Sequence, residues 1–246
     1  VLVDDMETKK KFGFMNPACR PVFAIMNPEL TYSVSKYQTG AGTADIFAHT
    51  YMRYLTPDAS FLGDQYCVGT LKTVVKYGPI AVNDPENYEA RAELMLAGSF
   101  SHNDLTSIGR AGMPKGGEHG LEQQMSGMYD TAHGAGLSVM MPAMLNYIIK
   151  HGNEAQVARV AQFATDVFEV DADYADAKGV AQEGVRRFKA WLASLGMPLT
   201  IKELGIDPKE IPNILDATVP TEDSAINGFM KMDRAAVKEI YESAAE

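Results

Sequence analysis

The sequence is poor in cysteine, with only Cys19 and Cys67 among 246 residues. Two cysteines outside any Cys-x-x-Cys pair exclude a disulfide framework and a thiolate-rich metal site. We interpret both as small buried hydrophobic residues and expect a reduced, cytoplasmic protein. Histidine and carboxylate side chains are then the only plausible ligands for a metal.

The chain has no excess of positive charge, because 32 acidic residues against 22 basic ones give a formal net charge of −10. Nucleic acids and anionic membranes attract clustered positive charge, so we expect neither as a partner. The longest apolar stretch, residues 137–149, is too short and too interrupted to span a bilayer. No signal peptide is visible. A hydrophobic fraction of 46% is that of an ordinary globular protein with one large or two small domains.

From about residue 33 onward the apolar residues recur with helical period, which predicts a mainly α fold of eight to ten helices. Glycine and proline mark the expected helix boundaries, and Asp84-Pro85 looks like a helix start. The boundaries are expected at Thr56-Pro57, Gly78-Pro79, Gly112 to Pro114, Gly152-Asn153, and Gly196 with Pro198.

The first thirty residues differ from the rest. Residues 1–3 and 21–26 have the composition of short strands, joined by a lysine-rich loop. Two strands alone do not make a stable sheet. We therefore expect either the edge of a larger sheet or a hairpin lying on a helical body.

Three of the five histidines occur in a pattern that suits a metal site. Asp45 and His49 are four residues apart and so share one face of a helix, while His119 and His133 are fourteen apart. One carboxylate and three imidazoles could surround a zinc or ferrous ion. The alternatives are a hydrogen-bonded pair of Asp45 and His49, a surface position for His119 and a helix-capping role for His133.

The two remaining histidines have weaker signals. His102 could lie just outside such a site, although a core or helix-surface position is the simpler interpretation. His151 follows an apolar helix, where a cation suits the negative end of the helix dipole. Asn103 and Asp104 in an expected helix over 95–108 indicate either a cleft or a polar helix contact.

Nothing in the chain has the pattern of a complete nucleotide-binding loop. Gly134 and Gly136 follow a loop and not a strand, and Gly116-Gly117 has no Gly-x-Gly-x-x-Gly around it. Both are poor dinucleotide fingerprints. No Gly-x-Ser-x-Gly elbow appears either.

Segments 42–50, 97–103 and 119–136 together resemble the iron-containing (group III) alcohol dehydrogenases, in particular the butanol dehydrogenases and related aldehyde reductases. The resemblance covers essentially the whole chain. It implies the helical, dehydroquinate-synthase-like C-terminal domain of that family, which is the metal-binding catalytic domain, over residues 31–246. Residues 1–30 would be the last strands of an N-terminal α/β nucleotide-binding domain.

The same resemblance implies Asp45, His49, His119 and His133 as ligands of a divalent iron or zinc ion. It also implies NAD(P)H as the cofactor of the full-length protein. The chain departs from the family in two ways. The upstream phosphate-binding segment is absent, so we expect little NAD(P)H binding and no activity by the chain alone. Gln123 occupies a position where many relatives carry histidine, and an amide cannot shuttle a proton near neutral pH.

We therefore expect a metal-dependent alcohol dehydrogenase or aldehyde reductase, with Gln123 as the candidate catalytic residue acting through water. Phe47, Met125 and Met128 suggest an apolar pocket for a small alcohol or aldehyde, and we expect a homo-oligomer. One alternative is a stand-alone helical metal-binding or interaction protein with a structural site. Another is a glycerol dehydrogenase-like member of the same superfamily.

Overall fold

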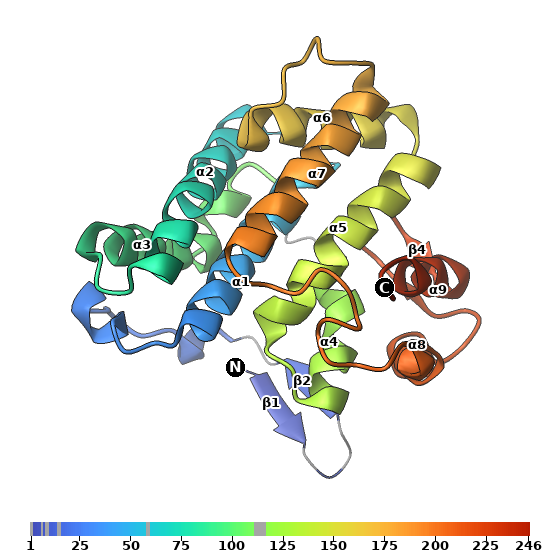
Figure 1. The fold of residues 1–246 in the computed structure, drawn as a ribbon, viewed down its shortest axis with the longest axis horizontal. Coiled ribbons are helices and arrows are strands. Elements are labelled where there is room, and N and C mark those ends of the chain that lie inside the picture. The colour runs from blue at the N-terminus through green and yellow to red at the C-terminus, as the bar shows by residue number, and fades with distance from the viewer. Residues whose placement is uncertain (1, 6, 8–9, 14–15, 58–59, 111–116) are drawn as a thin grey trace.

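The computed structural model describes residues 2–5, 7, 10–13, 16–57, 60–110 and 117–246, and its architecture is mainly helical, as predicted (Figure 1). Within these ranges nine α-helices follow one another along the chain. They are α1 (Lys36–Tyr54), α2 (Phe61–Asn83), α3 (Tyr88–His102), α4 (Glu118–Tyr129), α5 (His133–His151), α6 (Glu154–Phe168), α7 (Ala177–Ser194), α8 (Ile211–Thr218) and α9 (Arg234–Ser243).

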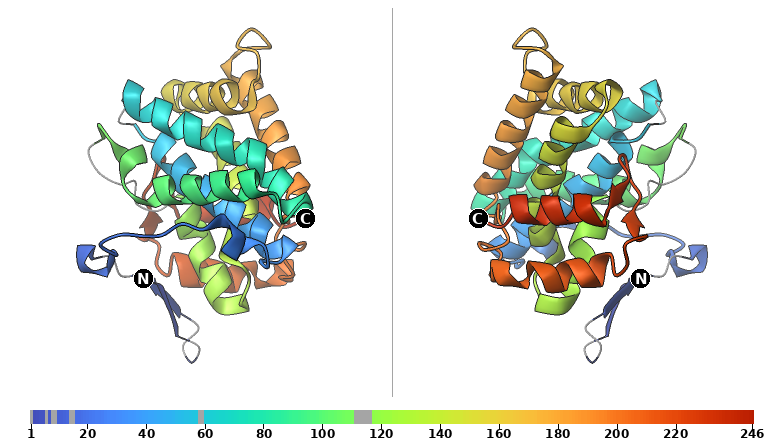
Figure 2. Two further views of the ribbon diagram at one scale, coloured as in Figure 1. Left: turned by 90° about the vertical axis from the view of Figure 1, so that its left-hand side faces the viewer. Right: turned by 90° about the vertical axis from the view of Figure 1, so that its right-hand side faces the viewer.

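The strands are short and form two antiparallel pairs. β1 (Leu2–Asp5) pairs with β2 (Lys10–Gly13), and β3 (Ala225–Ile226) pairs with β4 (Met232–Asp233). The β1–β2 hairpin projects from the helical body beside α4 (Figure 2). The second strand of this hairpin therefore lies within the segment that we predicted to be a loop.

The prediction of a strand over residues 21–26 is wrong. This segment has no strand pairing and stands out from the helices, with Val22, Phe23 and Ile25 exposed. A strand needs a partner for its backbone groups, and none of the described strands pairs with this segment. Whether residues 1–30 belong to a nucleotide-binding domain stays a prediction.

Helix α1 lies at the centre of the helical body, packed against α2, α3 and α5. Its buried face carries Phe47, whose ring centroid lies 4.9 Å from that of Phe188 and 4.8 Å from that of Trp191 on α7. Phe47 and Met125 are fully buried in the core. The structure thus contradicts the prediction that these two side chains line a substrate pocket, because aromatic packing already fills the space around Phe47.

Polar caps fix where most helices begin. The Ser35 hydroxyl accepts a hydrogen bond from the Gln38 amide at the start of α1, and Asn153 and Gln156 form a reciprocal capping box at the start of α6. Helix α3 is capped by Asn87, whereas we predicted a helix start at Asp84. Asp84 instead follows the last turn of α2, so the Asp-Pro pair belongs to a helix end.

The predicted boundary at Gly78-Pro79 is also wrong, because α2 continues through Pro79 to Asn83. A proline inside a helix removes the amide that would bond to the carbonyl four residues earlier, here Val75. The indole Nε1 of Trp191 donates to that carbonyl at 3.1 Å. A side chain from α7 therefore replaces the hydrogen bond that Pro79 removes.

Three further predictions concern the cysteines, one helix boundary and a membrane span. Cys67 is buried as predicted, whereas Cys19 is exposed because it ends a single 3-10 turn (Pro17–Cys19) outside the helical body. The boundary expected at Gly112 to Pro114 lies outside the described residues. No helix in the described part of the chain combines the length and apolar character that a membrane span requires.

Candidate metal centre

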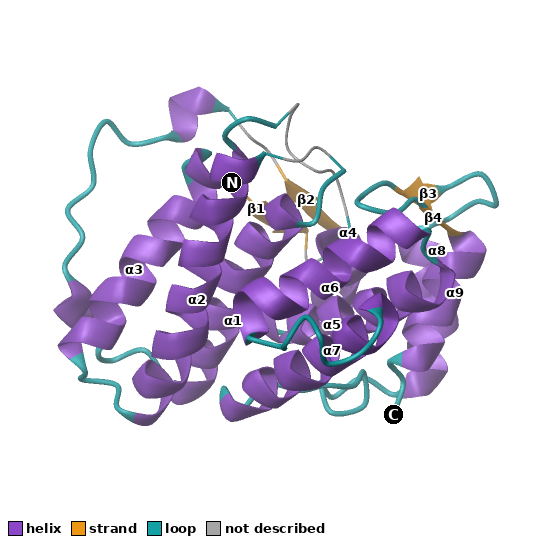
Figure 3. Ribbon diagram, turned by 90° about the horizontal axis from the view of Figure 1, so that it is seen from above, coloured by secondary structure: helices purple, strands orange, loops and turns teal. Residues whose placement is uncertain are grey.

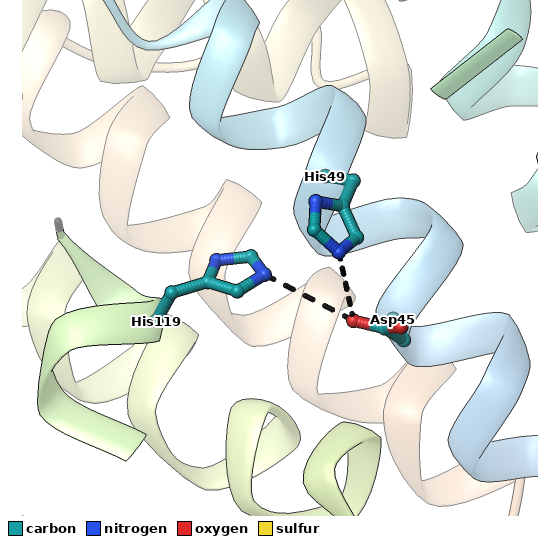
Figure 4. Close-up of side chains that lie close together, drawn as sticks. All are labelled: Asp45, His49 and His119. Atoms are coloured by element: carbon teal, nitrogen blue, oxygen red, sulfur yellow. Dashed lines mark ion pairs between the residues drawn. The ribbon is translucent and has the colours of Figure 1, made fainter. Parts of the chain in front are cut away.

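Three helices meet at the candidate site. Asp45 and His49 lie one turn apart on α1, His119 is in the first turn of α4, and His133 is the first residue of α5. Figure 4 shows the imidazoles of His49 and His119 both directed at the carboxylate of Asp45. The alternatives do not hold, because the His119 side chain is largely buried in the first turn of α4 and His133 starts α5 rather than capping the end of a helix.

The three imidazoles turn the same ring nitrogen toward one carboxylate oxygen. The Nε2 atoms of His49, His119 and His133 lie 3.4, 3.9 and 3.8 Å from Asp45 Oδ1. The candidate ligand atoms of Asp45, His49 and His119 all lie within 4.8 Å of one another. His133 is not in this set of three, although its Nε2 faces the same carboxylate oxygen. Four ligands of one zinc ion, bound at about 2.1 Å, would be roughly 3.4 Å apart in a tetrahedron. The spacing therefore suits a metal ion after small adjustments.

Two atoms at the centre of this group lack hydrogen bonds. Asp45 Oδ1 and His119 Nε2 are buried and neither has a hydrogen-bond partner. Buried polar atoms in native proteins are nearly always bonded, so an unpaired carboxylate oxygen facing an unpaired ring nitrogen calls for an explanation. A shared cation would satisfy both atoms. The donor set and its unpaired atoms thus fit a divalent metal.

The side chains are partly open to solvent, with exposed fractions from 18% for His119 to 34% for Asp45. Burial lowers the pKa of His49, and the neighbouring His119 and His102 lower it further. For His119, burial acts to lower the pKa, but hydrogen bonding and the charge of Glu118 raise it above the usual value. A neutral His49 keeps a ring lone pair free for a ligand.

Two buried glutamates outside the predicted set of ligands also contact the site. His119 Nδ1 is 3.1 Å from Glu118 Oε1, and His133 Nδ1 is hydrogen bonded to Glu122 Oε2. Both carboxylates belong to α4 and are one turn apart. The sequence signal was present, because Glu118 directly precedes His119 and Glu122 follows four residues later on the same helix face.

His102 lies beside the site, with its ring centroid 3.8 Å from that of His49. Its Nδ1 is 3.0 Å from Ser101 Oγ, and burial lowers its pKa. Asn103 and Asp104 do not line a cleft, since α3 ends at His102 and both residues are exposed beyond it. Asp104 pairs with Arg20 at 2.7 Å.

Gln123 is one turn after His119, but its described hydrogen bond is directed to the β1–β2 hairpin and not to the candidate metal site. Its amide nitrogen donates to the backbone oxygen of Lys11 in β2 at 2.8 Å. The side chain therefore joins α4 to the hairpin. His151 closes α5, and its Nε2 lies 2.8 Å from Glu239, far along the helix from His133.

The Gly134-x-Gly136 pair serves close helix packing. A Cβ added to Gly134 would lie 1.8 Å from the backbone oxygen of Ala41, and one added to Gly136 would lie 2.5 Å from Glu122 Oε1. Because Ala41 and Glu122 already occupy the space beside these glycines, this turn cannot cradle a pyrophosphate. Figure 3 shows α1, α4 and α5 from above.

Comparison with known proteins places the chain in a family. Residues 39–245 match the model of the Fe-containing alcohol dehydrogenase family, C-terminal. The chain is 31% identical over 241 residues to NADH-dependent butanol dehydrogenase A of Clostridium acetobutylicum, a match that spans 98% of the chain and 60% of that relative. It is 30% identical over 210 residues to the NADPH-dependent aldehyde reductase YqhD of Escherichia coli, covering 85% of the chain and 52% of that protein.

A solved structure agrees with this result. NADH-dependent butanol dehydrogenase A from Thermotoga maritima superposes with a TM-score of 0.89 at 28% identity, over all of this chain and 61% of that one. The chain thus spans about three fifths of the length of these two butanol dehydrogenases. On the match of residues 39–245, the chain belongs to the Fe-containing alcohol dehydrogenase family and corresponds to its C-terminal, helical region.

Proposed function

We propose that Asp45, His49, His119 and His133 bind one divalent metal ion. The observation that carries the proposal is the convergence of three Nε2 atoms on Asp45 Oδ1, together with the missing hydrogen bonds of Asp45 Oδ1 and His119 Nε2. Imidazole and carboxylate suit zinc and ferrous iron alike. The partial exposure of the four side chains favours a catalytic site over a closed structural one.

We further propose that the chain is the metal-binding half of an NAD(P)H-dependent alcohol dehydrogenase or aldehyde reductase acting on small alcohols or aldehydes. When bound, the metal supplies a Lewis acid for the oxygen of the substrate. Asp45 and the imidazoles hold it at the meeting point of α1, α4 and α5. The relatives named as butanol dehydrogenase and aldehyde reductase support this substrate class.

We assign nucleotide binding mainly to the part of the relatives' length that this chain does not match, and expect no activity from the chain alone. Gln123 cannot exchange a proton near neutral pH, so we assign proton transfer to water in its neighbourhood. The amide nitrogen of Gln123 is hydrogen bonded to the Lys11 carbonyl, so a contact between Gln123 and that water stays a prediction.

Metal content tests the first proposal. His119→Ala and His133→Ala should each lower the zinc or iron bound per chain, measured by mass spectrometry of the purified, dialysed protein. His151→Ala is the matched control, because its imidazole also pairs with a carboxylate, away from the site, and its metal content should not change. Equal metal content in all four proteins would refute the site.

An activity assay tests the second proposal. The chain alone should not oxidise NADH or NADPH in the presence of butanal, whereas a protein that also carries a family nucleotide-binding domain upstream should do so. Loss of this activity in the His119→Ala variant of the longer protein would tie turnover to the site. Turnover by the chain alone would contradict the proposal that nucleotide binding and metal binding belong to different parts of the protein.

A further inference from the structure

Glu118 and Glu122 are among the most buried charged residues of the described chain, at 1% and 0% exposure. A buried carboxylate is costly unless hydrogen bonds or charges compensate it. Each of these carboxylates faces the Nδ1 atom of one site imidazole, Glu118 that of His119 and Glu122 that of His133. The pairing repeats across one helical turn of α4.

This contact decides which ring nitrogen carries the proton. An ionised carboxylate can only accept a hydrogen bond, so the Nδ1 atom of each imidazole must donate. The proton then sits on Nδ1 and the lone pair on Nε2. In both residues it is Nε2 that faces Asp45 Oδ1, at 3.9 Å for His119 and 3.8 Å for His133. The two glutamates therefore leave the lone pairs directed at one point.

Gly136 explains how Glu122 reaches its position. It lies one turn after the start of α5, and a Cβ there would come within 2.9 Å of three Glu122 atoms. The glycine leaves the space that the buried carboxylate fills beside His133. Glu122 Oε1 has no hydrogen-bond partner, so the described hydrogen bond of this buried carboxylate is the one between Oε2 and His133.

We propose that Glu118 and Glu122 are positioning residues, which hold His119 and His133 in the tautomer and orientation that a metal requires, with Gly136 making room for Glu122. This inference rests on the proposed metal site. A carboxylate behind a metal-binding histidine fixes its ring and raises its basicity, and loss of such a partner typically lowers metal affinity about 10- to 100-fold.

Zinc titration of the chain tests the proposal. Glu118→Gln and Glu122→Gln should each weaken zinc binding about 10- to 100-fold, measured by competition with a chromophoric chelator. Glu239→Gln is the matched control, because Glu239 also pairs with an imidazole, that of His151, but lies outside the site. Its zinc affinity should equal that of the unchanged chain.

The outcomes separate the two proposals. An unchanged chain that binds no zinc, or that keeps its affinity when His133 is replaced by alanine, overturns the metal site itself. A chain that binds zinc and loses it with His133→Ala, but keeps full affinity with Glu122→Gln and Glu118→Gln, leaves the site standing and overturns the positioning role.

A second measurement decides the matter even if a glutamate variant fails to fold. Nitrogen-15 NMR of the imidazoles in the chelator-treated, unchanged chain reports which ring nitrogen carries the proton. His119 and His133 should both show the Nδ1–H tautomer in the unchanged chain. In a folded Glu122→Gln variant, the preference for this tautomer should weaken at His133 and not at His119. An Nε2–H tautomer at both residues in the unchanged chain would overturn the inference.

Discussion

Asp45 Oδ1 is the atom around which the candidate site is arranged, because Nε2 atoms from three helices face it and none is hydrogen bonded to it. The glutamates behind His119 and His133 account for the direction of those nitrogens. The close packing of the helices at this site also depends on glycines. Gly134 lets α5 approach the backbone of Ala41, on the same helix as Asp45 and only one turn away.

At the residue scale we predict that Gly134→Ala strongly destabilises the protein. The new methyl group would lie 1.8 Å from a backbone oxygen that cannot turn away, so α5 must shift, at about 1–3 kcal/mol or more. Gly69→Ala is the control, since nothing lies within 4 Å of its Cβ position in α2. That change should stabilise by up to about 1 kcal/mol. Urea unfolding measures both free energies, and equal effects would contradict the packing argument.

Gln123→Leu should loosen the β1–β2 hairpin without changing metal content, because it removes the hydrogen bond to the Lys11 carbonyl. Amide hydrogen exchange of residues 10–13 should become faster. Gln124→Leu, the neighbouring half-buried glutamine of α4, should leave this exchange unchanged. A loss of metal in Gln123→Leu would instead place Gln123 in the metal centre.

At the scale of single elements, α2 shows how tertiary contacts change a local prediction. The sequence predicts that this helix ends at Gly78-Pro79, but in the structure it continues for another turn to Asn83. A proline ends a helix chiefly because it removes a hydrogen bond and crowds the preceding turn. Here Trp191 replaces the missing donor at Val75, and Gly78 lets α2 pack close to Thr43 of α1. Contacts with α1 and α7 thus offset the free-energy cost of a proline inside α2.

Trp191→Phe should destabilise the protein by about 1–3 kcal/mol through the carbonyl that loses its donor, besides the change in packing. The loss of unfolding free energy caused by Trp191→Phe should be smaller in a protein that also carries Pro79→Ala. The new alanine brings its own amide to the Val75 carbonyl. The four proteins form a double-mutant cycle, in which we expect a coupling of about 0.5–3 kcal/mol. Additive effects in thermal unfolding would show that Trp191 does not substitute for that amide.

At the scale of the whole molecule, segment 21–30 stands out because its large apolar side chains are exposed away from the helical core. These are Val22, Phe23, Ile25, Met26 and Leu30. Large apolar side chains exposed along one segment favour association with another surface. Their exposure adds a physical reason to the prediction that the chain forms homo-oligomers.

Replacing Phe23 and Ile25 together by serine should therefore shift the chain toward monomer, measured by sedimentation velocity over a range of concentrations. The helical core should be unaffected, because neither side chain is buried in it. Tyr174→Ser is the control, an exposed aromatic residue in the loop between α6 and α7. A monomeric parent chain would contradict the prediction.

Local sequence patterns determined the helical class and much of the candidate site. The period of apolar residues predicted α6 and α7, and the spacing of Asp45 and His49 placed both on one helix face. These features depend on neighbours within a few turns, so the sequence alone carries them. The scarcity of histidines made His119 and His133 candidates as well, and the resemblance to a family supported them, although spacing alone could not place them beside α1.

What only the tertiary structure decided depends on contacts between distant segments. The partner of β1 proved to be residues 10–13 and not 21–26, because composition does not fix which segment supplies a pairing edge. Phe47 proved to be core because α7 covers it. Glu122 became a partner of His133 only through the packing of α4 against α5, whereas Glu118 adjoins His119 along the chain and depends on the fold only for its burial.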